Sequence, residues 1–328
     1  MASLFAEVAI AHDLRVGIAA AHWPQATTLD QAADYIERYR ATGDDAWLNL
    51  CDDFFSTAAQ SNFGSNSHRW HYLRAWHAQA AHRFTEASTH LEEMGGLGQA
   101  DVHIPLLQAN LARIIGDTQT AQRHCRRVSA SHLLLGQFCL AQTRIQKSPE
   151  EINLPDLQSL LTTAGERLPR RQRAWAYQVL AQVAEHLDQP ELALTAANSA
   201  YELDPSMQHR VQLGQLLNRN ARYEQALALT LSQLDQVPAL SLVRLAALTK
   251  LNRSAEAAAL RDTLHAAFSH HIAHDQLLHA REMGEFYLDV VPMPQRAARL
   301  ARYNWSLQRE PEDHELLVRT LLIDPAAE

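Results

Sequence analysis

The chain has 328 residues and a formal net charge of −8, with 29 Lys and Arg residues against 37 Asp and Glu residues. Binding to nucleic acid requires a basic surface that displaces counterions from phosphates, so this acidic balance disfavours a nucleic-acid partner. Only 11 glycines and 12 prolines occur, which favours helix almost throughout, and the absence of an apolar run of about 20 residues predicts no transmembrane segment.

Residues 1–27 do not fit a repeat and are predicted to form an N-terminal extension. They lack a positively charged region ahead of a sufficiently long apolar run, so no secretory signal peptide is predicted. We therefore expect a cytoplasmic protein, or a periplasmic one if a signal has been removed. Thr27-Thr28 lead into a helix N-cap, and a first helical hairpin is predicted at about 29–60.

The next part of the chain repeats the helix–turn–helix pattern after a polar loop at residues 61–67. Two hairpins carry a small residue inside the second helix, Ala87 and Ala121, and these residues lie 34 positions apart. This spacing is typical of stacked helix pairs. Including a third, less regular unit, the predicted hairpins here are 68–94, 102–130 and 131–168.

The repeat is clearest in two consecutive segments in the middle of the chain. Pro205 and Pro238 lie 33 residues apart, as do the small residues Ala193 and Ala226. Each segment has apolar residues at helical spacing, a short polar turn, and a second helix that the proline is predicted to end. The two predicted hairpins are 174–205 and 207–238.

The C-terminal part continues the pattern, with Ala257 at the small position of the next unit. A short polar-faced helix then closes the array, because an apolar outer face without a neighbour would aggregate. The predicted hairpins are 239–268 and 270–310, followed by a cap at 312–322 and a tail at 323–328. The sequence thus predicts an all-α fold, a single α–α superhelix over residues 28–322 with roughly seven hairpins and a C-terminal capping helix.

The two central segments resemble the tetratricopeptide repeat. The second segment matches it at Leu213, Gly214, Ala226 and Pro238. The first segment matches more fully, at Tyr177, Leu180, Ala181, Ala193, Ala197, Ala200 and Pro205. The resemblance implies a right-handed solenoid that binds protein partners.

The C-terminal third is similar to a particular group of uncharacterised bacterial tetratricopeptide proteins. The similarity lies in RLAALTKLNRSAEAAALRDTLHAAF, in the run from His279 to Glu282, and in Asn304-Trp305. Members of this group are usually exported and tend to be encoded near membrane proteins of the HupE/UreJ type. The resemblance therefore implies a periplasmic adaptor with a membrane-protein partner.

In solenoids of this kind the first helix of each hairpin lines a concave groove, and the resemblance implies four groove-facing positions in each such helix. On the N-terminal wall these are Arg69, Tyr72, Trp76 and Gln79, then His103, Leu106, Asn110 and Arg113. On the central wall they are Trp175, Gln178, Gln182 and Glu185, then Gln208, Val211, Gln215 and Asn218. Aromatic and Arg side chains dominate binding energy and amides suit an extended backbone, so a bound peptide or helix is expected. The alternative is that Trp76 and Trp175 fill gaps between helices.

Enzyme signatures are missing from the sequence, which has no HExxH, GxSxG or dinucleotide fingerprint. Gly95-Gly96 and Gly98 lack the strand and the Gly-Lys-Ser/Thr of a phosphate loop, so we interpret them as a flexible connection. The dipeptides Arg281-Glu282 and Arg309-Glu310 are interpreted as structural ion pairs or helix-end contacts. We therefore predict a non-enzymatic interaction scaffold without a cofactor.

Eighteen histidines are the basis of an alternative function. His270 and His274 share a helix face, and His279 is a candidate third ligand, so this region could bind a transition metal for a membrane partner. Solvated imidazoles are the simpler interpretation and no metal site is predicted. A second set, which we expect even less to bind metal, is His68, His71, His77 and His82.

The three cysteines, Cys51, Cys125 and Cys139, are an odd number without CxxC spacing, so neither a disulfide framework nor a structural zinc site is predicted. Cys125 and Cys139 could meet across neighbouring helices, but we expect buried free thiols that act as small apolar side chains.

Overall fold

The computed structural model describes residues 27–60, 67–95, 102–145, 147–230 and 237–323. Within these ranges the chain is helical, with short turns, two 3-10 turns (Pro149–Glu151 and Gly165–Arg167) and no β-strand, which confirms the predicted all-α fold. The N-terminal extension, the loop at 61–66, Gly96, Gly98 and the last five residues of the predicted tail lie outside the described residues.

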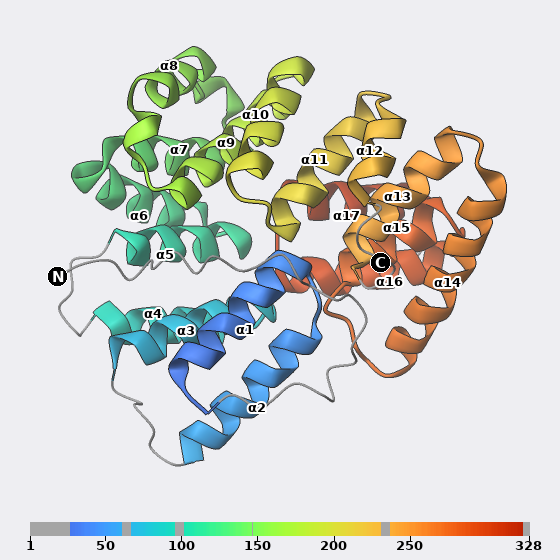
Figure 1. The fold of residues 1–328 in the computed structure, drawn as a ribbon, viewed down its shortest axis with the longest axis horizontal. Helices are drawn as coiled ribbons and strands as arrows, with labels where there is room; N and C mark the ends of the chain where they lie inside the picture. The colour runs from blue at the N-terminus through green and yellow to red at the C-terminus, as the bar shows by residue number, and fades with distance from the viewer. Residues whose placement is uncertain (1–26, 61–66, 96–101, 146, 231–236, 324–328) are drawn as a thin grey trace.

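The helices form eight consecutive pairs and a final helix in the part of the chain that the structure describes (Figure 1). The first four pairs are α1 (Leu29–Thr42) with α2 (Ala46–Gln60), α3 (His68–Ala80) with α4 (Phe84–Gly95), α5 (His103–Ile114) with α6 (Thr118–Ser131), and α7 (Leu133–Arg144) with α8 (Leu154–Ala164). The others are α9 (Arg170–His186) with α10 (Pro190–Leu203), α11 (Met207–Arg219) with α12 (Tyr223–Thr230), α13 (Pro238–Lys250) with α14 (Ser254–Ala273), and α15 (Ala280–Asp289) with α16 (Pro294–Leu307), before α17 (Pro311–Ile323).

One turn geometry recurs between the two helices of a pair. In five pairs the first helix ends at a residue with φ between 55° and 85°, the left-handed conformation. The N–H of the following residue then donates to the carbonyl five residues earlier, at 2.7–3.0 Å, which is the hydrogen bond of a Schellman cap. The five left-handed residues are His82, Gly116, Asp188, Ala221 and Asn252. Only one of them is glycine, so this repeat is much plainer in the backbone than in the sequence.

The pairs stack because several first helices pack both on their own partner and on the first helix of the next pair, as α7 does on α9, α11 on α13, and α13 on α15. A single pair buries apolar surface on one side only, and stacking supplies the second side. The predicted small residues Ala87, Ala121, Ala193 and Ala226 are fully buried at these contacts, whereas Ala257 is half-buried.

Two predicted boundaries differ from the structure. Pro238 is the first residue of α13 and so begins a helix, a position where the missing N–H of proline costs nothing. Helix α14 continues past residue 268 to Ala273 because Phe268 and Ile272 extend its apolar face onto the core. The last pair therefore begins at Ala280 and not at His270.

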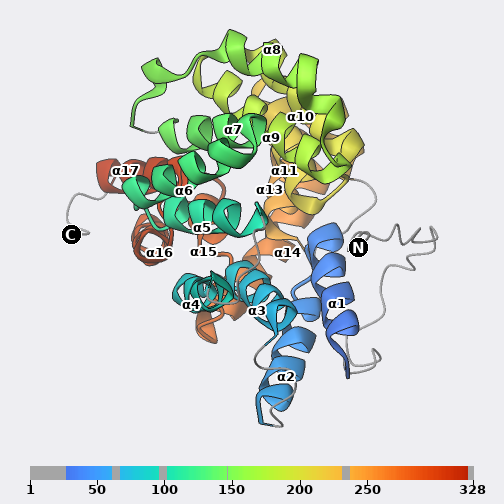
Figure 2. The same cartoon turned by 90° about the vertical axis from the view of Figure 1, so that its left-hand side faces the viewer.

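The array is closed between its ends, which the repeat pattern does not predict. Helix α1 packs on α11, and Arg40 forms a 2.5 Å ion pair with Asp204. On the other side of the molecule the N–H of Arg309 donates to the carbonyl of Ile114 at 2.6 Å. Figures 1 and 2 show the red C-terminal helices beside α5. The first and last hairpins thus touch parts of the chain that are far away in sequence.

Gly43 allows the first hairpin to come this close. It caps α1 with φ 67°, and a Cβ there would lie 2.9 Å from Met207 and 3.0 Å from Val237. A side chain would therefore strain the backbone and also push the central helices away from α1.

The expectation of free thiols is wrong for two of the three cysteines. Cys125 in α6 and Cys139 in α7 form a disulfide, because the antiparallel packing of these helices brings their Cα atoms within 5.4 Å. Cys51 is a buried free thiol, and burial followed by the charge of Asp52 raises its pKa to about 12.

Candidate functional site

The N-terminal wall of the predicted groove is largely engaged within the chain. Arg69 is exposed and forms an ion pair with Asp30. Tyr72 and Trp76 are half-buried against the aromatic core of the first hairpins, which supports their packing role, and the buried Trp76 Nε1 has no hydrogen-bond partner. Gln79 is half-buried, and its carbonyl accepts a hydrogen bond from the turn after α3.

On α5 the predicted wall faces other helices. His103 Nε2 lies 3.3 Å from the amide nitrogen of Gln172. Asn110 accepts a 2.9 Å hydrogen bond from Arg113, and Arg113 forms a 2.9 Å ion pair with Glu310. Leu106, the remaining position, packs against the core. The wall residues on α5 therefore contact α9 and the turn before α17.

The central wall on α9 is also internally bonded. Gln178 is only 5% exposed, and Trp175 packs partly buried against the core, as the gap-filling alternative expects. Gln182 accepts a 3.0 Å hydrogen bond from Gln142, and Glu185 forms an ion pair with Arg219.

On α11 the predicted residues are more accessible. Gln208 is exposed, Gln215 and Val211 are half-buried, and the Asn218 amide donates to the carbonyl of Val243 at 2.8 Å. The buried Oδ1 of Asn218 has no hydrogen-bond partner. The four predicted sets thus lie on first helices. Arg113, Gln182 and Asn218 bond to other parts of the chain, while Arg69 and Gln208 are exposed.

A polar cluster at the closure was missed by the sequence reasoning. Arg281 on α15 donates to Asp313 at 2.6 Å and to Glu310 at 2.8 Å, and Asn304 donates to Asp313 at 2.6 Å. Asp313 is 1% exposed. Arg281 and Glu310 belong to the two dipeptides that we interpreted as structural ion pairs or helix-end contacts, and they pair with each other across 29 positions.

The electrostatics of this cluster act in opposite directions on its two buried carboxylates, Glu310 and Asp313. Burial opposes ionisation of Glu310, but the guanidinium groups of Arg113 and Arg281 outweigh it and lower the pKa of Glu310 to about 2. For Asp313 the burial effect prevails over Arg281 and raises the pKa. A basic side chain from α5 and another from α15 thus hold the same carboxylate, which joins the third helix pair to the C-terminal end of the array.

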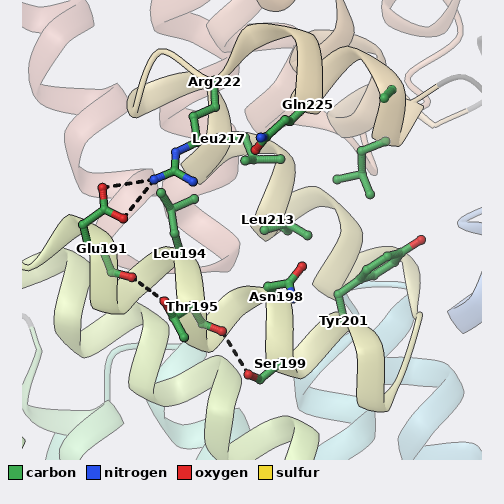
Figure 3. Close-up of a pocket in the computed structure, with 12 residues that line it drawn as sticks. Glu191, Leu194, Thr195, Asn198, Ser199, Tyr201, Leu213, Leu217, Arg222 and Gln225 are labelled. Carbon is green, nitrogen blue, oxygen red and sulfur yellow. Dashed lines mark hydrogen bonds and ion pairs between the residues drawn. The ribbon is translucent and has the colours of Figure 1, made fainter.

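A groove on the outer face provides a site of a different kind (Figure 3). It has a volume of about 650 Å³ and lies between the second helices α10 and α12, with α11 as its floor. Four leucines form its apolar surface, Leu194, Leu213, Leu217 and Leu229. Sequence reasoning overlooked it because it considered only the first helix of each pair as a binding surface.

Polar groups surround this apolar floor. Arg222 and Glu191 form an ion pair with contacts of 2.9 and 3.1 Å at one end of the groove, and Figure 3 shows Tyr201 at the other end. Asn198 and Gln225 line the rim between them. An apolar floor with a mixed polar rim is the surface that an amphipathic segment of a partner requires.

The histidines of the predicted metal alternative are divided between two places. The rings of His270 and His274 have centroids 4.2 Å apart at the end of α14. His279 Nε2 instead donates to the carboxylate of Asp45 at 2.8 Å, in the turn after α1. Burial lowers the pKa of His279, but the hydrogen bond and charge of Asp45 raise it by more. Among the described residues, these three histidines do not converge into a set of metal ligands.

The chain matches no protein-family model and no curated protein sequence. Two solved structures are similar to it. A tetratricopeptide repeat protein from Parabacteroides merdae ATCC 43184 is 15% identical, with a TM-score of 0.44, over 77% of this chain and 98% of that one. The P58(IPK) TPR domain is 12% identical, with a TM-score of 0.29, over 92% and 99%. The fold of this chain follows from its own helices and the contacts between them.

None of the described helices combines the length and the apolar character needed to cross a bilayer.

Proposed function

We propose that this protein is a non-enzymatic interaction scaffold and that the groove between α10 and α12 binds an amphipathic helix of a partner protein. The observation that carries the proposal is the groove itself. Its floor includes Leu194, Leu213 and Leu217, each 6–7% exposed, and its rim carries the exposed residues Glu191 and Ala228. Its volume of about 650 Å³ is in the range of about 300–1,000 Å³ typical of ligand pockets.

The shape and chemistry of the groove favour a helix as the occupant. Helices α10 and α12 are both second helices and flank α11, so a helix laid between them continues the packing of the array. Its apolar face would cover Leu213 and Leu217, and charged residues on its flanks would meet Glu191 and Arg222. The partner segment therefore needs leucine-type anchors one turn apart and charges of both signs.

The concave wall is a second position for the same function. Three of its residues, Trp76, Arg113 and Asn218, have a buried nitrogen or oxygen without a hydrogen-bond partner, and such atoms could bond to a peptide backbone. A guest would first have to separate internal contacts such as the Arg113–Glu310 ion pair. The outer groove needs no such rearrangement, so we prefer it.

The Cys125–Cys139 disulfide supports the expectation that the scaffold works outside the cytoplasm, because disulfides persist in oxidising compartments. An exported location would agree with the adaptor role that the C-terminal resemblance implies. The metal-handling alternative gains no support, because His270 and His274 lie together at the end of α14 whereas His279 bonds to Asp45.

The test begins with selection of binding peptides from a displayed helical library against the full chain. We expect Ala228→Arg, which places a charged side chain in the groove from an exposed position, to weaken the selected peptide at least about tenfold. Ala259→Arg, at an exposed position of α14 outside the groove, is the matched control.

Trp76→Phe tests the concave wall separately from the outer groove, because it removes the unpaired N–H and keeps an aromatic ring. A peptide that is weakened by Trp76→Phe and unaffected by Ala228→Arg would move the site to the concave wall. Peptides unaffected by either change would contradict both positions.

A further inference from the structure

Three potential metal ligands converge on the second hairpin, outside the sites described above. His71 lies on α3, and His90 and Glu93 lie one turn apart on α4. The His71 and His90 Nδ1 atoms are 3.1 Å apart, and a Glu93 carboxylate oxygen lies 2.7 Å from the first and 3.3 Å from the second. Of the histidines in the 68–82 set, only His71 takes part.

These separations are close to those of a bound ion. Ligand atoms at about 2.0–2.1 Å from a tetrahedral zinc ion lie about 3.3 Å from one another, so small side-chain shifts would admit the ion. The side chains of His71 and His90 are 11% and 14% exposed, whereas Glu93 is 50% exposed. The imidazoles are thus held in place by packing, and the carboxylate faces outward.

We propose that His71, His90 and Glu93 bind one divalent transition-metal ion of the zinc class and thereby link α3 to α4. Two neutral imidazoles and a carboxylate are ligands that such ions accept, with a fourth position left to water or to a partner side chain. The ion would lie at the surface of the second hairpin, on helices distinct from those of the outer groove.

Binding of a metal ion would have to change the hydrogen bonds that these side chains make without it. Arg74 Nε donates to His90 Nε2 at 3.1 Å, so the proton of the neutral ring is on Nδ1, from which it can be donated to Glu93. A metal on Nδ1 would displace this proton to Nε2, and Arg74 would lose its acceptor. Arg74 also pairs with Glu86 at 2.5 Å, so it keeps a partner when it turns away.

The guanidinium of Arg74 donates to His90 Nε2 at 3.1 Å and so lies on the far side of the ring from the proposed ion. The same guanidinium is a positive charge near the ion and therefore weakens binding. Affinity for the metal should accordingly rise when Arg74 is neutralised.

Calorimetric titration of the full chain with ZnCl₂ in a non-chelating buffer at pH 7.5 tests the proposal. We expect one Zn²⁺ per chain, and a strong visible absorption band when Co²⁺ replaces Zn²⁺ in tetrahedral coordination. Because loss of even a supporting partner costs about 10- to 100-fold, His90→Gln should weaken binding by more than about 100-fold. His270→Gln with His274→Gln, at the exposed pair, is the control and should change nothing at this site.

Glu93→Gln keeps the test valid if His90→Gln fails to fold, because Glu93 is half exposed. It should weaken binding at least about tenfold with an unchanged melting temperature in the absence of metal. Zn²⁺ binding that is equal in wild type and in both ligand variants, or that disappears only in the His270/His274 variant, would overturn the proposal. Arg74→Gln should tighten binding, and equal or weaker affinity would overturn the assignment of His90 Nδ1 as the ligand.

Discussion

The middle of the array and the closure between its ends are built in different ways. From α9 to α13, hairpins stack through alanines and leucines that are buried in one continuous core, with Ala193 and Ala226 recurring at a spacing of 33 residues. At the closure, Arg113, Arg281, Glu310 and Asp313 meet through ion pairs between segments about 30 to 200 residues apart. The stack therefore depends on local periodicity, whereas the closure depends on a few charged residues that must all be present.

The largest effect is expected from breaking the closure at Arg281. Arg281→Met removes the ion-pair partner of Asp313 and one of the two ion-pair partners of Glu310, and so leaves buried charge uncompensated. We expect the free energy of unfolding to fall by about 3–5 kcal/mol, measured by urea denaturation. Arg261→Met removes an exposed pair with Asp262 and should change it by less than about 0.5 kcal/mol.

Hydrogen exchange in Arg281→Met should be faster at the amide of Arg309, which bonds to Ile114 across the closure. Exchange in α9 and α10 should stay as in wild type. Equal acceleration in both regions would show that the closure and the stack unfold together.

A truncation inside the stack should cost somewhat less. Leu216 on α11 is 2% exposed, so Leu216→Ala creates a cavity and lowers the free energy of unfolding by about 2–5 kcal/mol. Leu322→Ala, at an exposed position of α17, is the matched control and should be nearly neutral. Because each hairpin mainly contacts its neighbours, the Leu216 variant should leave the Arg309 amide protected, and loss of that protection would contradict the separation of the two regions.

The disulfide joins two neighbouring hairpins within the stack and should contribute about 2–3 kcal/mol, since it closes a loop of about 15 residues. Alkylation of the unfolded protein without reductant should modify one cysteine, Cys51, and alkylation after reduction should modify three. Three reactive thiols in protein prepared under oxidising conditions would show that Cys125 and Cys139 do not pair.

The smallest effect concerns Glu285 on α15, beside the closure. Burial, and then the charge of Glu282, raise the pKa of Glu285 to about 7. A folded-state pKa above the unfolded value of about 4.3 means that stability is present at low pH and is lost as the pH rises toward 7. Because the side chain is partly solvated, we expect Glu285→Gln to stabilise the protein by about 1 kcal/mol at pH 8 and to have no effect at pH 4. Thermal melts at both pH values check this, and a gain at pH 4 would contradict the assignment.

Several residues show which features of the fold could be predicted from the sequence. Ala87, Ala121, Ala193 and Ala226 were predicted as small positions from spacing alone, and all four are fully buried. Asp188 lies in the short polar turn predicted within the hairpin 174–205, although its left-handed conformation was not predicted. The spacing predicts these positions because a hairpin and its contact with the next hairpin recur with a period of about 35 residues.

The contacts of the candidate site were harder to predict, because the spacing of residues within a repeat does not specify them. The predicted wall residues lie on the first helices as expected, but their partners come from elsewhere, as Glu310 does for Arg113. His71 was among the histidines considered, while His90 and Glu93 were not, because nothing in their spacing relates them to α3. Any peptide binding by the wall remains a prediction.

The amino-acid sequence by itself determined the helices, most of their turns and the stacking of successive hairpins, because these follow from apolar periodicity and from turns within one repeat length. Only the tertiary structure decided the closure of the array, the Cys125–Cys139 bond, the groove between α10 and α12, and the meeting of His71 with His90 and Glu93. Each of these depends on the curvature that accumulates over several hairpins or on the rotation of one helix against another. The pattern of residues along the sequence specifies neither this curvature nor this rotation.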